Sequence, residues 1–137
     1  MASFSPVLDR EVGDDWTVSG ITLTDGGQPA NLVGATVTAL FYARDQIAAV
    51  ATLTEALVPG VGGLTVAADR TTGVLTEAWI SALVTSDVKP QDRRETRFPT
   101  RLAILVTDSL GRERTFLIIP FRPLDRGSET PATGVLS

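Results

Sequence analysis

Residues 16–24 alternate between apolar and polar side chains, and this period of two is typical of a β-strand with one buried face. The alternation slips by one residue at Gly20, where we predict a β-bulge, because glycine tolerates the backbone angles that an extra residue requires. Asp25, Gly26 and Gly27 follow and are typical of a tight turn, since glycine adopts positive φ at little steric cost. A strand that runs into a glycine turn constrains this part of the chain to a β-hairpin or a β corner.

Further β patterns follow along the chain. Strands are predicted near residues 35–43, 47–58, 64–68, 74–79, 101–108 and 113–122. Residues 47–58 fit a helix through their alanines and a strand through their β-branched residues, and we predict a strand. Both faces of 101–108 are predicted to be buried. The run before Pro120 predicts a central strand that ends there at an edge or bend.

Together these elements predict an antiparallel β-sandwich of about seven or eight strands with one short helix and extended terminal arms. The helix is expected within residues 81–88, and Trp16 and Trp79 are expected in the core, because large aromatic side chains dominate cores. Residues 1–124 are assigned to the sandwich with its N-terminal arm. Residues 125–137 are assigned to a C-terminal arm, since their composition is too polar to build core.

Length and composition suit one compact domain, because 137 residues with 43% hydrophobic content can form a single core. No run approaches the roughly 20 apolar residues of a bilayer span. Residues 1–6 lack the basic region and apolar stretch of a leader, so we expect a soluble, unprocessed chain. The absence of cysteine excludes disulfides and thiol chemistry.

The chain also contains no histidine, which removes most hydrolytic and many metal-dependent mechanisms. A Ser-His-Asp triad, a Cys-His pair and a histidine-ligated metal are all excluded, and no phosphate-binding loop is present. Asp14 and Asp15 could ligate calcium or act as acid and base, but adjacent strand residues point to opposite faces. We predict instead that Gly13 and Asp14 form a turn in which an aspartate oxygen bonds its own backbone. No catalytic, cofactor-binding or metal-binding residue is predicted, and no enzymatic activity.

Charge is distributed unevenly along the sequence. Residues 1–69 carry two basic and eight acidic side chains and residues 70–137 carry ten and eight, which gives −6 and +2 and sums to the net charge of −4. This balance argues against nucleic-acid binding and leaves open a head-to-tail contact between copies, or ordinary solvated charge. A cluster of basic residues lies in and just after a polar loop at 91–100, and together with Arg126 these residues form a candidate protein interface. Its members are Arg93, Arg94, Arg97 and Arg101.

Several of these signals occur in an order that resembles a small β-sandwich domain of tailed-bacteriophage virion proteins, similar to the N-terminal domain of baseplate upper proteins. The matching positions are Gly13, Asp14 and Trp16 at the opening, Asp25, Gly26 and Pro29 at the turn, Leu32, Gly34, Ala35, Thr36 and Val37 in the next strand, and then 69–75, Thr85 and 108–111. The arginine-rich loop and the C-terminal arm depart from that pattern.

The resemblance implies a non-enzymatic structural component of a virion, which docks on a tail, baseplate, neck or capsid surface through its loops and arms. The implied partners are other virion proteins and copies of the chain itself, with no nucleic acid, membrane, cofactor or small-molecule substrate. The implied location is the virion, after assembly in the cytoplasm of the host bacterium. An alternative is a carbohydrate or host-surface binding module, which an exposed aromatic cluster or a bound calcium would favour. An enzyme domain would instead require a carboxylate pair facing one cleft.

Overall fold

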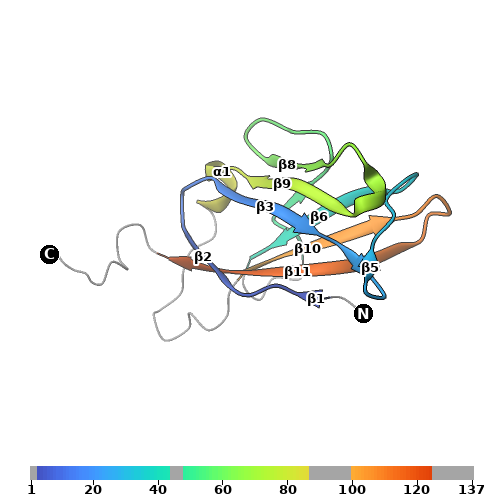
Figure 1. Cartoon of the computed structure of the whole chain (residues 1–137). Coiled ribbons are helices and arrows are strands. Elements are labelled where there is room, and N and C mark those ends of the chain that lie inside the picture. Colours follow the sequence, from blue (N-terminus) through green and yellow to red (C-terminus); the bar gives the residue numbers. More distant parts are fainter. Residues whose placement is uncertain (1–2, 44–47, 87–99, 125–137) are drawn as a thin grey trace, which may run out of the picture.

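The computed structural model describes residues 3–43, 48–86 and 100–124, and these residues form a predominantly β structure (Figure 1). The strands are β1 (Ser3–Phe4), β2 (Leu8–Glu11), β3 (Trp16–Thr22), β4 (Thr24–Asp25), β5 (Gln28–Pro29), β6 (Thr36–Tyr42), β7 (Ala51–Leu53), β8 (Gly62–Val66), β9 (Val74–Ile80), β10 (Thr100–Thr107) and β11 (Glu113–Leu124). A 3-10 turn, η1 (Arg70–Thr72), precedes β9, and one short helix, α1 (Ala82–Thr85), follows it. Within these ranges, no helix has the length and apolar character of a membrane span.

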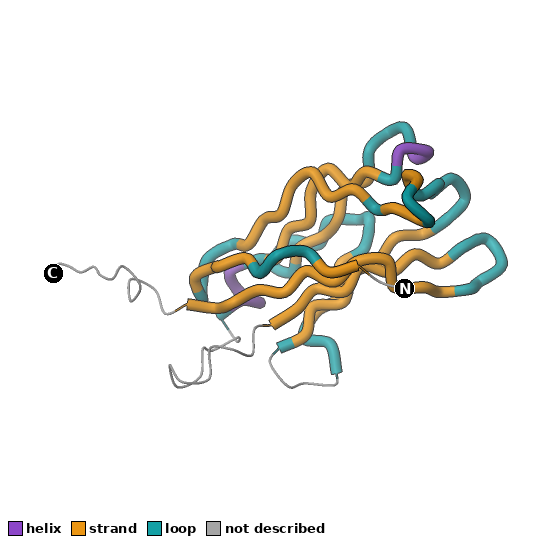
Figure 2. The backbone as a smooth tube through the Cα atoms, turned by 60° about the horizontal axis from the view of Figure 1, so that its bottom comes forward, coloured by secondary structure: helices purple, strands orange, loops and turns teal. Residues whose placement is uncertain are grey.

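Two sheets lie in separate layers (Figure 2). The long sheet has the order β1-β11-β10-β6-β7, with β2 also paired to β11, and the short sheet has the order β3-β9-β8. The hairpin of β4 and β5 stands apart, and Gly26 and Gly27 at its turn both have positive φ, as the sequence predicts. The all-β, sandwich-like fold with one short helix is therefore confirmed. The predicted C-terminal arm lies outside the described residues.

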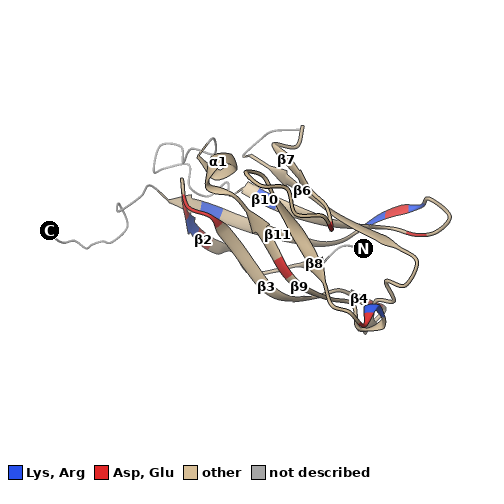
Figure 3. Ribbon diagram, turned by 90° about the horizontal axis from the view of Figure 1, so that it is seen from above, with Lys and Arg blue, Asp and Glu red and all other residues tan. Residues whose placement is uncertain are grey.

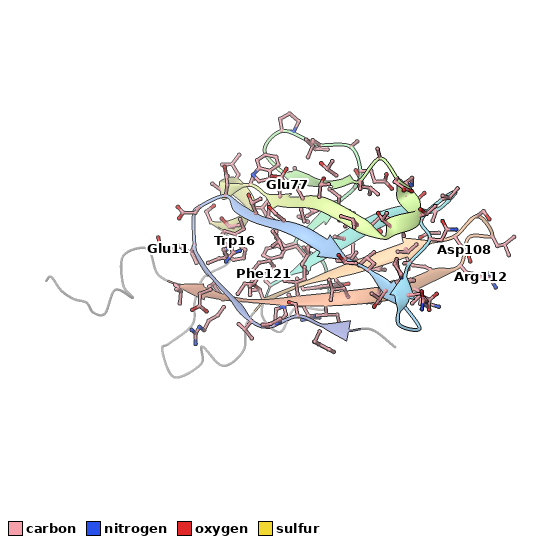
Figure 4. All side chains as sticks on the ribbon, viewed as in Figure 1. Glu11, Trp16, Glu77, Asp108, Arg112 and Phe121 are labelled. Atoms are coloured by element: carbon pink, nitrogen blue, oxygen red, sulfur yellow. The ribbon has the colours of Figure 1, made fainter. Side chains whose placement is uncertain are left out.

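A cluster of three aromatic rings fills the core between the layers. Trp16 is fully buried, and its ring lies 5.5 Å from that of Phe41 and 5.1 Å from that of Phe121 (Figure 4). The indole Nε1 donates a hydrogen bond to the backbone oxygen of Glu11 at 2.7 Å. Trp16 is thus the predicted core anchor, because its apolar body is enclosed while its one donor is satisfied. Trp79 is only half-buried and lies outside this core.

Strand β10 occupies the centre of the long sheet, antiparallel to β11 on one side and to β6 on the other. Leu102, Ile104 and Val106 pack into the core, while Ala103 and Leu105 on the opposite face are also buried. The prediction that both faces of this strand are buried is confirmed.

The N-terminal strands pair with β11 in parallel, so the long sheet is mixed rather than wholly antiparallel. Phe4 is the register partner of Ile118. Strand β11 runs through Pro120 to Leu124, so no strand end lies at Pro120, and the predicted span of 113–122 is two residues too short. The backbone oxygens of Ile118 and Leu124 accept hydrogen bonds from the backbone N–H groups of Ser5 and Val12. The backbone polar groups of alternate strand residues point toward the same neighbouring strand, so those of Pro120 also point toward the N-terminal segment. Pro120 therefore faces the interval between β1 and β2, where its missing N–H removes no ladder bond.

The bulge predicted at Gly20 is also absent. Strands β3 and β9 keep one register on both sides of Gly20, with Ser19 opposite Glu77 and Ile21 opposite Leu75. Gly20 has a φ of 67°. The alternation of buried and exposed residues shifts by one position in β9 as well, opposite Gly20, so both strands change together and their pairing stays in register. The register shift lies instead between Thr65 and Val66 of β8.

Candidate interaction site

Asp14 and Asp15 connect the turn before β3 to α1. The Oδ1 atom of Asp15 accepts a hydrogen bond from the backbone N–H of Ala82 at 2.7 Å, and the Thr85 hydroxyl donates to the backbone oxygen of Asp14 at 2.6 Å. The turn before β3 is therefore present, and the Asp15 carboxylate bonds the first residue of α1. Among the described residues, no group of three or more acidic side chains is arranged to hold a metal ion.

Most of the predicted arginine interface cannot be placed. Arg93, Arg94, Arg97 and Arg126 lie outside the described residues, as does most of the polar loop at 91–100. Arg101 lies at the start of β10, and its guanidinium carbon is 4.4 Å from the centre of the Tyr42 ring. This stacking anchors Arg101 on the outer face of the long sheet.

The outer face of the long sheet carries an apolar row across four strands. Phe4, Ile118, Ala103 and Leu40 are successive register partners, and Phe4 is 71% exposed.

The charge difference between the two halves of the sequence does not separate two faces of the molecule. Strand β3 from the first half pairs with β9 from the second, and β6 likewise pairs with β10. The two halves are interleaved in both sheets, so a head-to-tail contact cannot be inferred from that difference.

A cleft of about 500 Å³ opens at one end of the sandwich, between residues 31–35 and the turn that joins β10 to β11. We call it the hairpin-end cleft. Its apolar surface is formed by Val33, Ala35, Val106 and Phe116. Val106 and Phe116 belong to or pack against the core, so the floor of the cleft is continuous with the rigid interior.

Two ion pairs at the cleft compensate most of its charge. Arg114 is 3.0 Å from Asp25 on the β4–β5 hairpin, and its guanidinium also stacks 4.3 Å from the centre of the Phe116 ring. Arg112 is 2.8 Å from Asp108 within the turn. Charged residues gather at the β10–β11 hairpin and beside β4 (Figure 3). Four of the five charged residues that line the cleft are matched in these pairs and Glu113 is the fifth, so the cleft offers an apolar floor and a lining with a net charge of about −1.

Asp108 fixes the wall formed by the β10–β11 turn. Its Oδ1 atom accepts from the backbone N–H groups of Leu110 at 2.9 Å and Arg112 at 3.0 Å. The bond from the Arg112 backbone is the largest cause of a lowered pKa at Asp108, so the carboxylate stays ionised. Leu110 at the tip of this turn is 75% exposed. The turn therefore holds an apolar side chain outward at the rim.

The opposite wall, residues 31–35, is held from below by Arg70 of η1. Its Nε atom donates to the backbone oxygen of Leu32 at 3.0 Å, and its Nη2 atom donates to that of Ala35 at 2.8 Å. The side chain of Asn31 accepts from the backbone of Val33 at 3.0 Å, which leaves Val33 63% exposed. This wall is therefore rigid, and it too presents an apolar side chain at the rim.

Glu55 completes the support of this wall. It accepts bonds from Arg70 at 2.8 and 3.1 Å and from the backbone N–H of Val37 at 3.0 Å. The Arg70 guanidinium holds the pKa of the Glu55 carboxyl below its ordinary value, and Glu55 in turn raises the pKa of Arg70. Sequence reasoning missed both residues. They are 15 positions apart and carry no local motif.

No known protein family matches the chain, and no curated protein sequence matches it either.

Proposed function

We propose that the chain is a non-enzymatic structural subunit of a tailed-phage virion, which docks on neighbouring protein subunits. The observation that supports this most is the hairpin-end cleft, a rigid hollow with an apolar floor, paired charges and exposed apolar tips on both walls. Surfaces of this composition are typical of protein interfaces rather than of catalytic sites. The resemblance of residues 13–37 to virion domains supplies the biological setting.

Several features of the cleft favour a protein ligand over a small charged substrate. Asp25 and Asp108 are each engaged by an arginine, so the rim does not present an uncompensated charge cluster. Val33 lines the cleft and is strongly exposed, and Leu110 is exposed at the tip of the turn that forms the other wall. Covering two such side chains removes apolar surface from water and contributes about 25 cal/mol per Å².

A carbohydrate-binding role has less support among the described residues. Sugar binding commonly uses an aromatic ring with a free face, but the Phe116 ring at the cleft is covered by Arg114. The strongly exposed aromatic ring of Phe4 lies beside Ile118 on the outer face of the long sheet.

Mass spectrometry of purified particles tests this proposal. Particles isolated on a density gradient from cells that naturally produce the protein should contain it in a fixed, multi-copy ratio to the other particle proteins. Immunogold electron microscopy should label one defined substructure. A protein that is absent from particles would contradict the virion role, and one that instead binds a glycan array would favour the carbohydrate-binding alternative.

A further inference from the structure

We propose that the hairpin-end cleft binds residues 130–137 of a neighbouring copy of this chain. This inference rests on the proposed structural role and adds to it both the partner and the surface. It joins three observations: the chemistry of the cleft, the place where the described chain ends, and the composition of the residues that follow.

The chemistry of the cleft suits an uncharged segment that carries apolar side chains. Two ion pairs are already formed at it, its floor contains Val106 and Phe116, and Val33 and Ala35 add apolar surface on one wall. A volume of about 500 Å³ lies within the range of about 300–1,000 Å³ that is usual for binding pockets. Residues 130–137 read Thr-Pro-Ala-Thr-Gly-Val-Leu-Ser and contain no charged side chain. Val135 and Leu136 supply the apolar side chains that the floor can accept.

The described chain ends at Leu124, at the end of the sandwich opposite the cleft (Figure 1). Strand β11 has twelve residues and begins at Glu113, which lines the cleft. At about 3.4 Å per residue it is about 40 Å long. A chain fully extended from Leu124 to Leu136 also spans about 40 Å. The segment could therefore enter its own cleft only at full extension, whereas a neighbour placed end to end receives it without that constraint.

The end at which β11 finishes is also apolar. Leu57, Val58 and Leu83 are 56%, 46% and 72% exposed near α1, and the Ser81 hydroxyl bonds the Gly60 backbone there at 2.7 Å. An end-to-end junction would bring this apolar surface toward Val33 and Leu110 of the next copy. Such a contact is heterologous, so it builds a ring or a filament rather than a two-fold dimer.

A complementation experiment with full-length variants tests the inference. Val33→Glu disables the cleft, and Leu136→Asp disables the segment. In sedimentation velocity the unmodified chain should self-associate, and each variant alone should associate at least tenfold more weakly. Their equimolar mixture should form a one-to-one dimer of twice the 14.5 kDa chain mass, because the mixture contains one intact cleft for each intact segment.

Val7→Glu is the matched control, since Val7 is 53% exposed and is not among the residues that line the cleft. This variant should associate as the unmodified chain does. Circular dichroism checks that each variant is folded, and Val33→Ser, a milder polar change at the same lining residue, replaces Val33→Glu if that variant is not.

Three results would overturn the inference. They are an unmodified chain that stays monomeric at every soluble concentration, variants that associate normally, and a mixture that does not form the dimer. None of them affects the particle measurement above, which tests the virion role separately.

Discussion

The two ends of this sandwich are finished in different ways. At the end that carries α1, hydrogen bonds from Ala82 and Thr85 close the helix onto residues 14–15. At the other end, Asp108 and Asn31 fix two separate turns that stand apart with a hollow between them. Figure 2 shows α1 and η1 at these opposite ends. Hydrogen bonds thus close the end that carries α1, and hydrogen bonds of the same kind fix two separate turns on either side of the cleft at the other end.

This contrast shows that an open surface need not be a loosely held one. The walls of the hairpin-end cleft are supported by Arg70, Glu55 and Asp108, and its floor belongs to the core. A cleft held in this way loses little conformational entropy when a ligand enters, which favours binding. The following substitutions measure how firmly each end is held.

Replacing Trp16 with alanine should have the largest effect, because it empties the centre of the aromatic cluster beside the sealed end. We expect the free energy of unfolding to fall by about 3–5 kcal/mol in urea titrations followed by circular dichroism. Trp16→Phe should cost less, since the ring remains. A loss below about 1 kcal/mol for Trp16→Ala would show that this cluster does not anchor the fold.

A matched pair of glycines tests how closely the chain packs beneath the open end. Gly20 and Gly73 have φ values of 67° and 69°, so alanine suffers the same backbone strain of about 1–2 kcal/mol at both. An added Cβ at Gly73 would lie 2.5 Å from the backbone oxygen of Leu23, whereas at Gly20 it would meet nothing within 4 Å. Thermal unfolding should therefore show Gly73→Ala to be the more destabilising by about 2 kcal/mol. Equal losses would mean that the chain around Gly73 yields freely.

At the sealed end, Thr85→Val should lower the free energy of unfolding by about 1–2 kcal/mol, because the Asp14 backbone oxygen loses the hydroxyl donor. Ser86→Ala is a suitable control, since the Ser86 hydroxyl is exposed and bonds only within its own turn. Hydrogen exchange should show faster exchange around α1 in Thr85→Val and not in the control. Unchanged exchange would contradict the view that this bond closes the end.

The smallest effect is expected from Glu55→Gln, which weakens the support of the cleft by about 1 kcal/mol at neutral pH. The pKa of Glu55 is lower in the folded chain than its ordinary value of 4.5, so its pairing stabilises the protein above that value. This stabilisation is lost as the pH falls through the folded-state pKa. The unfolding free energies of the unmodified chain and of Glu55→Gln should therefore converge in acid. A constant difference down to pH 2 would contradict the assigned role.

Local patterns in the sequence were sufficient for the longer strands from β3 onward, but not for β1 and β2. The alternation of Val37, Ala39 and Phe41 and the Asp25-Gly26-Gly27 turn were interpreted correctly, because each depends on neighbouring residues. The parallel pairing of Phe4 with Ile118 could not be predicted in this way, since the two positions lie far apart in sequence and residues 3–11 lack clear alternation.

The site was harder to predict, because the cleft exists only where distant segments meet. Asn31 and Asp108 are recognisable as turn residues, but nothing local indicates that their turns face each other. The arginine cluster was a local signal of charge alone, and within the described chain only Arg101 can be assessed.

The parallel pairing of the N-terminal strands also has a consequence for synthesis. Residues 3–11 leave the ribosome before their partners on β11, which lie more than 100 positions later. Pairings of such long sequence separation close large loops and form slowly. Residues 3–11 must therefore remain without these partners until β11 has been made. Pulse-labelled hydrogen exchange during refolding should find their amides among the last to be protected.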